Sequence, residues 1–436
     1  MIDTKKLRQR ILDLAIRGKL VPQDPNDEPA SVLLDRIRAE KERLIAEGKI
    51  NRSKTKKTAT DDKSHYPALP QGWAWSNIGE YLLNRDGERI PVSSAIRSKQ
   101  KNKIYDYYGA AGVIDKVDSY LFDERLLLVG EDGANLLSRS KDNAFFAEGK
   151  YWVNNHAHVL DAIDKCLLEY VALVINSQPL DDYITGSAQP KLSQDNLNSI
   201  PLAIPPYEEQ LRIISAVKSL FAIVEGLENE ISKISENIDT AKSKILELAI
   251  TGKLVPQNPE DEPASELLKR INPKAEIVTD NEHYPQLPDN WVICRLGGVV
   301  NVVNGRNQSE VVDDNGQYPI YGSGGIIGRA SAYLSLAGST IIGRKGTINN
   351  PLFVSENFWN VDTAFGMKPI EGIDDRYFFY FCKYFDFTSL NKSTTLPSLT
   401  KTNIEGISLP IPPMQEQIRI VAKVEQLFKL LNNICE

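Results

Sequence analysis

The longest regular pattern of apolar residues in the chain lies between Glu208 and Ile250. Apolar positions recur there at alternating spacings of three and four, which is typical of a helix that packs along another helix. Pro205 and Pro206 precede the pattern, and Gly252 follows it. The apolar positions are Val217, Phe221, Val224, Leu227, Ile231, Ile234, Ile238, Ala241, Ile245 and Leu248. We predict one helix of about 43 residues, roughly 60 Å long, which needs a partner helix along its stripe.

Shorter apolar runs occur on both sides of this helix and are separated by glycines. Two of them are LLLVG at residues 126–130 and STIIG at residues 339–343. Runs of this length, bounded by turn residues, predict strands. We therefore expect an α+β protein in which two domains, mainly of strands with some helix, are separated by long helices.

The same elements occur twice, in the same order. The repeated pairs are residues 7–37 with 241–271 (21 of 31 positions identical), 65–73 with 283–291, and 189–221 with 396–428 (15 of 33 identical). Between these markers only a sparse skeleton survives, in which Tyr108, Gly109, Gly112, Tyr120, Gly130 and Gly133 fall on Tyr321, Gly322, Gly325, Tyr333, Gly343 and Gly346. A shared frame with a diverged surface indicates two domains that have one fold and recognise different targets.

The repeat sets the predicted boundaries. They are an N-terminal helical segment and linker (1–64), a first recognition domain (65–206), a central spacer helix and linker (207–282), a second recognition domain (283–413) and a C-terminal spacer helix (414–436). By the repeat offsets, Glu436 corresponds to Asn229 and Met1 to Ser235. The two terminal helices together would rebuild one copy of the central helix, which predicts a pseudo-twofold circular arrangement.

Composition narrows the possible partners. A formal net charge of −7 argues against a protein that coats nucleic acid indiscriminately, so any DNA contact must be local or shared with a basic partner. No apolar run reaches membrane-spanning length, and the charged N-terminus lacks a signal core, so we expect a cytoplasmic chain without a membrane partner. The four cysteines, Cys166, Cys294, Cys382 and Cys435, lie far apart, which favours reduced and mostly buried thiols.

Complete catalytic motifs are missing. An adenine methyltransferase needs a (D/N/S)PP(Y/F/W) loop, but in IPPY (204–207) Ile204 cannot accept a hydrogen bond, and in NPLF (350–353) Leu352 replaces the second proline. The segment GSTIIGRK (338–345) lacks the Lys-Ser/Thr of a phosphate-binding loop and is better interpreted as a strand and a turn. We expect no catalytic residue and no cofactor.

A metal site is also not predicted. His156 and His158 would lie on the same face of a strand, but no cysteine or acidic cluster accompanies them in the sequence. We expect both histidines to be packed or hydrogen-bonded.

Residues that can reach base edges or phosphates mark two places in each domain. One is the Tyr-Gly turn with the following glycine hairpin, and the other is the loop before the exit helix. The candidates for DNA binding are Tyr108, Arg139, Lys141, Gln189 and Lys191 in the first domain, and Tyr321, Arg344, Lys345, Thr394 and Ser398 in the second. The tyrosines and glycines could equally serve the hairpin itself, and the charged residues could be plain surface. The basic linker from Lys49 to Lys63 could contact phosphates or be a solvated connector.

With these motifs the chain resembles the specificity subunit of a type I restriction-modification system. The resemblance rests on the GKLVPQ-P--EPAS segments (18–31 and 252–265), the YP-LP--W entries to the domains, and the IPP-QEQ-type exits (204–214 and 409–421). It implies that each domain reads one half of a bipartite site in double-stranded DNA. It also implies that antiparallel coiled-coil helices set the spacing of the half-sites and dock two methyltransferase subunits, which act with restriction/translocase subunits.

On this resemblance the chain is a non-catalytic subunit. The alternative is a coiled-coil adaptor that binds only protein, which would explain the helices but not two diverged domains within one frame.

Overall fold

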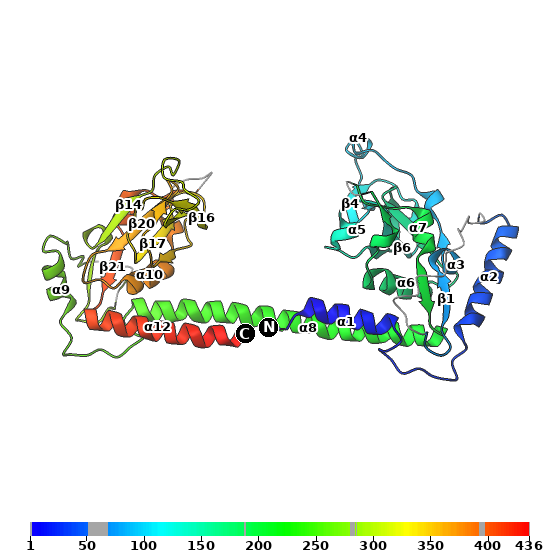
Figure 1. Cartoon of the computed structure of the whole chain (residues 1–436), viewed down its shortest axis with the longest axis horizontal. Helices are drawn as coiled ribbons and strands as arrows, with labels where there is room; N and C mark the ends of the chain where they lie inside the picture. Colours follow the sequence, from blue (N-terminus) through cyan, green and yellow to red (C-terminus); the bar gives the residue numbers. More distant parts are fainter. Residues whose placement is uncertain are drawn as a thin grey trace. The chain divides into compact units, whose positions relative to one another are not determined.

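The structure is a computed structural model that describes residues 2–50, 69–186, 189–279, 284, 286–391 and 397–435 (Figure 1). It divides into two compact units. The first unit is Ile2–Glu230, and the second contains Ile231–Glu436. Helix α8 (Tyr207–Ile250) is continuous and contributes to both units.

The first unit combines helices with two four-stranded sheets, ordered β2-β9-β6-β7 and β4-β3-β8-β5, and two strand pairs, β1-β12 and β10-β11. Its helices are α1 (Thr4–Ile16), α2 (Ala30–Ala46), α3 (Ile78–Tyr81), η1 (Asp86–Glu88), α4 (Ser94–Arg97), α5 (Asn135–Ser138), α6 (Cys166–Ser177), η2 (Asp181–Tyr183) and α7 (Gln194–Ser199). Its strands are β1 (Ala74–Asn77), β2 (Leu83–Asn84), β3 (Tyr105–Gly109), β4 (Gly112–Val117), β5 (Phe122–Asp123), β6 (Leu126–Gly130), β7 (Ala144–Ala147), β8 (Lys150–Val153), β9 (Ala157–Asp161), β10 (Ile184–Thr185), β11 (Lys191–Leu192) and β12 (Pro201–Ile204).

The second unit repeats this plan with sheets ordered β14-β20-β17-β18 and β16-β15-β19 and the pair β13-β21. Its further helices are α9 (Ala264–Ile271), η3 (Leu296–Gly298), α10 (Asp375–Tyr384), η4 (Phe387–Leu390), α11 (Lys401–Glu405) and α12 (Met414–Cys435). Its strands are β13 (Val292–Arg295), β14 (Val300–Asn304), β15 (Tyr318–Gly322), β16 (Gly325–Ala330), β17 (Ser339–Gly343), β18 (Leu352–Val354), β19 (Trp359–Asn360), β20 (Ala364–Pro369) and β21 (Ser408–Ile411).

The predicted core strands are confirmed. All five residues of β6 and all five of β17 are buried, because each strand lies inside its sheet. A strand covered on both faces has a continuous apolar run rather than an alternating one, as both sequences show. The segment 338–345 forms a strand followed by a turn, as expected. The α+β class and the repeated plan of two domains with a long helix are therefore confirmed.

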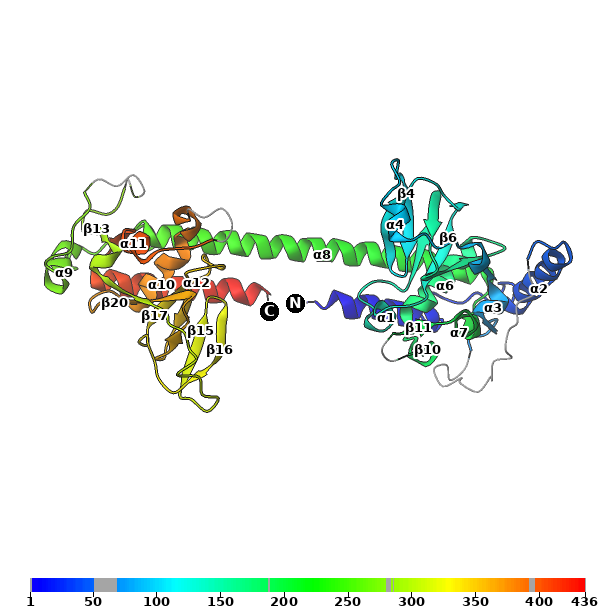
Figure 2. The same ribbon diagram turned by 90° about the horizontal axis from the view of Figure 1, so that it is seen from above.

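Helix α8 has the predicted extent, and in each unit a second helix lies along it (Figures 1 and 2). In the first unit α1 runs antiparallel to it, and Arg8 pairs with Glu228 at 2.9 Å. In the second unit α12 packs against its last turns, where Ile420 and Val424 share a core with Leu246. The stripe is buried at Val217, Val224 and Ile238, whereas Ile234, near the middle of the helix, is 44% exposed.

The segments repeated at the domain entries and exits make the same contacts in both units. The indole Nε1 of Trp73 donates to Glu209 at 3.0 Å, and that of Trp291 donates to Glu416 at 3.0 Å. Burial raises the pKa of both carboxyls. We call each Trp–Glu contact an entry clamp. Both tryptophans are buried, so their repetition reflects a structural role.

Beside each clamp an arginine binds an aspartate, Arg212 with Asp27 in the first unit and Arg419 with Asp261 in the second. The preceding turn needs glycine, because Gly252 has a φ of +70° and a Cβ there would lie 2.5 Å from Pro288. These contacts explain why GKLVPQ and EPAS occur twice.

In the described part of the chain no helix is long and apolar enough to cross a membrane. Cys294 and Cys382 are buried, Cys166 is exposed, and the side chain of Cys435 lies outside what the structure describes.

Candidate nucleic-acid interface

Tyr108 and Tyr321 stand at equivalent points, each at a β-bulge in the strand that opens a hairpin. The ring of Tyr108 stacks on Phe145 with centroids 6.1 Å apart, and that of Tyr321 meets Phe358 edge-on at 5.5 Å. Burial raises the pKa of both hydroxyls. Tyr108 thus packs against β7 of the neighbouring sheet, and Tyr321 packs against Phe358, which directly precedes β19. Contact of either tyrosine with DNA stays a prediction.

The hairpin tips expose apolar pairs that sequence reasoning missed. Val113 and Ile114 of β4 are 49% and 57% exposed, and the equivalent Ile326 and Ile327 of β16 are 62% and 60% exposed. In the sequence, two consecutive apolar residues directly after the turn glycine could have predicted these exposed pairs. Exposed methyl groups at a hairpin tip are suited to contact the thymine methyl in the major groove.

In each unit the loop before the exit helix lies beside the turn that follows β6 or β17, which joins two predicted residues, Lys345 and Ser398, only in the second unit. In the first unit Asp132 forms a β-bridge with Lys191, and Leu192 N–H donates to the Glu131 carbonyl at 2.7 Å. In the second unit Lys345 forms the same bridge with Ser398. We call the turn at 131–133 or 344–346, with the loop beside it, the paired loops.

The other predicted residues fall as follows. Gln189 is exposed in the first unit's loop. Arg139 ends α5 with a φ of +48° and donates to the Asn176 carbonyl at 2.5 Å, away from the loop. Lys141 is exposed, and its main chain is held by the Asn135 side chain. Thr394 lies outside the described residues, as does most of the basic linker.

Equivalent positions in the paired loops carry opposite charges. Glu131 and Asp132 in the first unit correspond to Arg344 and Lys345 in the second, since the same backbone hydrogen bonds hold both pairs. The acidic pair has local partners, because Lys191 forms an ion pair with Glu131 at 3.2 Å, and His156 is hydrogen-bonded to Asp132 at 2.7 Å. Lys345 is exposed. Only the second unit therefore presents a turn that attracts phosphate.

In the segment that precedes the hairpin, the charge difference between the two units is the opposite. Segment 97–103 (RSKQKNK) of the first unit has four basic residues, whereas its counterpart, 310–316 (EVVDDNG), is acidic. Arg97 and Lys103 both bind Asp115, at 2.8 and 2.5 Å. The hydrogen bond from Lys103, followed by that from Arg97, lowers the pKa of Asp115. Lys99 and Lys101 are exposed and line an open hollow of about 700 Å³. Sequence reasoning missed this segment, although its Lys/Arg density was a sufficient signal.

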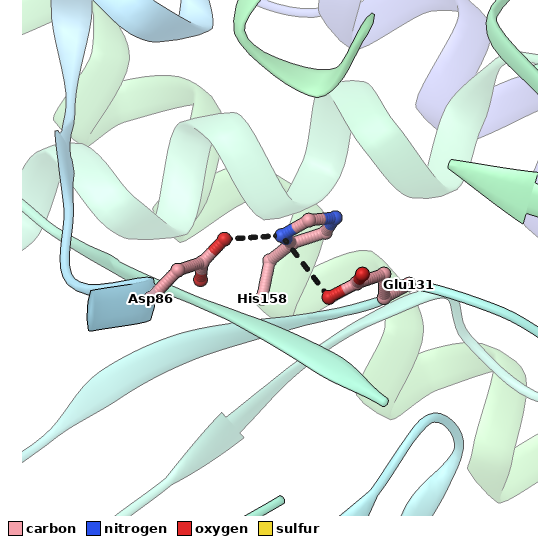
Figure 3. Close-up of side chains that lie close together, drawn as sticks. All are labelled: Asp86, Glu131 and His158. Atoms are coloured by element: carbon pink, nitrogen blue, oxygen red, sulfur yellow. Dashed lines mark hydrogen bonds and ion pairs between the residues drawn. The ribbon is translucent and has the colours of Figure 1, made fainter. Parts of the chain in front are cut away.

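Glu131 of the first unit's paired loops also belongs to a cluster with Asp86 and the buried His158 (Figure 3). The expectation that both histidines lie on one face of a strand is wrong, since only His158 lies within β9, where it is buried, while His156 is exposed. The expectation that no acidic cluster accompanies them is also wrong, because two acidic groups lie near His158. That both histidines are hydrogen-bonded is confirmed. One imidazole and two carboxylates are a donor set that a divalent cation accepts. Arg89, however, already binds both carboxylates, which favours an ion-pair network over a metal site.

Comparison with known proteins gives a consistent result. The family model "Type I restriction modification DNA specificity domain" matches the chain twice, at residues 70–234 and 288–436. The specificity subunits of the type I restriction enzymes EcoAI and EcoEI of Escherichia coli are each 30% identical to it, over 69% and 68% of this chain. The aligned parts span only 63% and 62% of those two proteins.

A solved structure that describes complex assembly and conformational transition of the type I R-M system shares the fold. Its TM-score is 0.56 at 17% identity, over 84% of this chain and 93% of that one. With two domain matches in the order of the two structural repeats, the chain belongs to the type I restriction modification DNA specificity family.

Proposed function

We propose that this chain reads DNA sequence for a type I restriction-modification complex, each unit reading one half of a bipartite site. The observation that carries the proposal is the contrast between frame and surface. The entry clamps, the order of the strands that the two units share and the hairpins are repeated in both units, whereas charge is reversed in two equivalent segments. Two readers of different half-sites need this combination, whereas an adaptor for two copies of one protein would keep like surfaces.

Phosphate contacts fix a protein's register on DNA without reading its sequence. In the first unit we assign them to Lys99 and Lys101, and in the second to Arg344 and Lys345, since these cations are exposed or at the surface. The local basic sites fit a chain whose net charge is −7. Base contacts belong to the paired loops and hairpins, with Gln189 and Lys191 in one unit and Ser398 in the other, and with Thr394, Tyr108, Tyr321, Arg139 and Lys141 as further candidates.

The partners follow from the same proposal. Double-stranded DNA is the ligand, two methyltransferase subunits dock on the helical scaffold of α1, α8 and α12, and restriction/translocase subunits join that complex. The partner subunits then carry out methylation and cleavage, and this chain determines the DNA site at which they act. The names of the relatives support this assignment, since both are specificity subunits of restriction enzymes.

The decisive experiment is selection of bound sites from random DNA by the full chain in complex with a methyltransferase partner. Residues 284–412 are then exchanged for the matching domain of a relative. We expect one half-site to change and the other to persist. A change in both half-sites, or in neither, would contradict modular reading, and absence of any selected sequence would favour the adaptor.

A further inference from the structure

His158 has hydrogen-bond acceptors on both sides of its ring. Its Nδ1 lies 2.5 Å from a carboxylate oxygen of Asp86 (Figure 3). Its Nε2 lies 2.8 Å from the Leu192 carbonyl oxygen. The side chain is fully buried, so water cannot replace either partner. A neutral imidazole has one N–H and one lone pair, and would leave one acceptor facing a lone pair. With Asp86 ionised, only the imidazolium ion, which has two N–H groups, satisfies both contacts.

The groups around the ring support a positive charge there. Asp86 of η1 and Glu131 after β6 face Nδ1, at 2.5 and 3.8 Å. Arg89, which follows η1, binds both carboxylates, and Lys191 of β11 binds Glu131 at 3.2 Å. Burial raises the pKa of each carboxyl, but the hydrogen bonds and charges of His158 and Arg89 outweigh it and hold both pKa values below the usual range. Both carboxylates stay ionised, and the ring keeps no free lone pair for a metal.

The cluster also connects the elements that form the paired loops. His158 reaches β11 through the Leu192 carbonyl, and the Leu192 N–H in turn reaches the Glu131 carbonyl. Gly133 N–H donates to the Pro190 carbonyl beside them. The position of Gln189 and Lys191 therefore depends on contacts made by His158.

The second unit shows that the fold does not need this charge. His158 pairs with Val129 in the sheet, and the equivalent partner of Ile342 is Phe365. Glu131 is replaced there by Arg344, whose guanidinium carbon lies 5.9 Å from the Phe365 ring centroid. The same backbone is thus built with an aromatic ring and a cation in place of the ion pairs.

We infer that His158, held as an imidazolium, is a positioning residue that sets the paired loops of the first unit for reading their half-site. This inference rests on the proposed function, since it assigns the loops to DNA. The role is specific to the first unit, and the second unit reaches its own loop position without a buried histidine.

The protonation state can be measured without DNA. The full chain, labelled with ¹⁵N-histidine, contains four histidines, and the His158 signals are assigned by their loss in His158→Gln. At neutral pH we expect both ring nitrogens of His158 to carry protons. A single neutral tautomer would overturn the inference.

The positioning role is measured by site selection with the full chain and its methyltransferase partner. His158→Gln keeps one donor and loses the other, so we expect about a tenfold loss of discrimination in the first half-site, and none in the second. Glu148→Gln is the control, because that residue is exposed in the same unit and lies between β7 and β8, outside the paired loops. Unchanged discrimination in His158→Gln, or equal losses in both half-sites, would overturn positioning.

A second variant guards against misfolding. Glu131→Arg with His158→Phe copies the Arg344 and Phe365 pair, so we expect a folded chain with altered preference in the first half-site alone. Preserved preference in this folded variant would overturn the inference. If the unaltered chain selects no DNA site, the proposed function fails, whereas the nitrogen signals still decide whether His158 is an imidazolium.

Discussion

At the scale of single residues, the exchange of charge between equivalent positions is the feature with the most direct functional meaning. Phosphate contacts contribute affinity by releasing counterions, one contact at a time. Since Lys99 and Lys345 lie at positions that are not equivalent in the two repeats, we expect the units to contact the DNA backbone at different points of a common frame.

We expect Lys345→Gln to weaken DNA binding to a similar degree on all sequences and to reduce the slope of log affinity against log salt by about one. Lys99→Gln has the same expected effect through the first unit. Titration of the complex at several salt concentrations measures both. Glu310→Gln, at an acidic position of the second unit, is the control and leaves the slope unchanged. A base-specific loss in Lys345→Gln would instead place this residue among the readers.

A further residue-scale prediction concerns the entry clamp. The pKa of Glu209 is raised by burial, so the folded chain keeps its proton at a pH where the unfolded chain has released it. Stability from this group is therefore present below the ordinary pKa of glutamate and falls as pH rises through the folded value. Glu209→Gln keeps an acceptor for Trp73, so we expect a weaker fall in the free energy of unfolding over this range. Urea unfolding at a series of pH values measures it, and an unchanged pH profile would contradict it.

Sequence reasoning reaches these residues unevenly, for physical reasons. Periodicity depends on local spacing, so α8, β6 and β17 are predicted with nearly their observed bounds. The cluster of His158 is not, because Asp86 and Glu131 come from distant segments and meet His158 only through the sheet register. The pairing of Lys345 with Ser398 is missed for the same reason, although both residues are among the candidates.

At the scale of elements, α8 is the part whose length has a measurable consequence. It is one unbroken helix that provides core residues to both units. In the proposed function such a helix fixes the gap between the half-sites.

Inserting four residues near Ile234 lengthens the helix by about 6 Å and keeps the apolar stripe in phase. We expect methylation by the complex to move to sites whose gap is longer by about one or two base pairs, with both half-sites retained. Sequencing of methylated sites measures the gap. Ser235→Ala, which leaves the length unchanged, is the control. An unchanged gap after insertion would limit the helix to docking of partners.

At the scale of the whole molecule, the proposed division of labour has a simple test. We expect the purified chain to transfer no methyl group from S-adenosylmethionine to DNA, because IPPY and NPLF lack the residues that hold the target amine. Incorporation of labelled methyl groups into DNA is measured with and without a methyltransferase partner, and the full complex is the positive control. Transfer by the chain alone would show that an active site was overlooked.

The repeated entry clamp also has an evolutionary consequence. Trp73 with Glu209 and Trp291 with Glu416 form the same joint, and the arginine–aspartate pairs beside them match as well. Mutations inside a domain can therefore accumulate without disturbing its attachment to the helices. A domain from a related protein with the same entry clamp would form the same contacts. In the proposed function, we expect recombination within these repeated flanking segments to create new specificities without compensating changes in the scaffold.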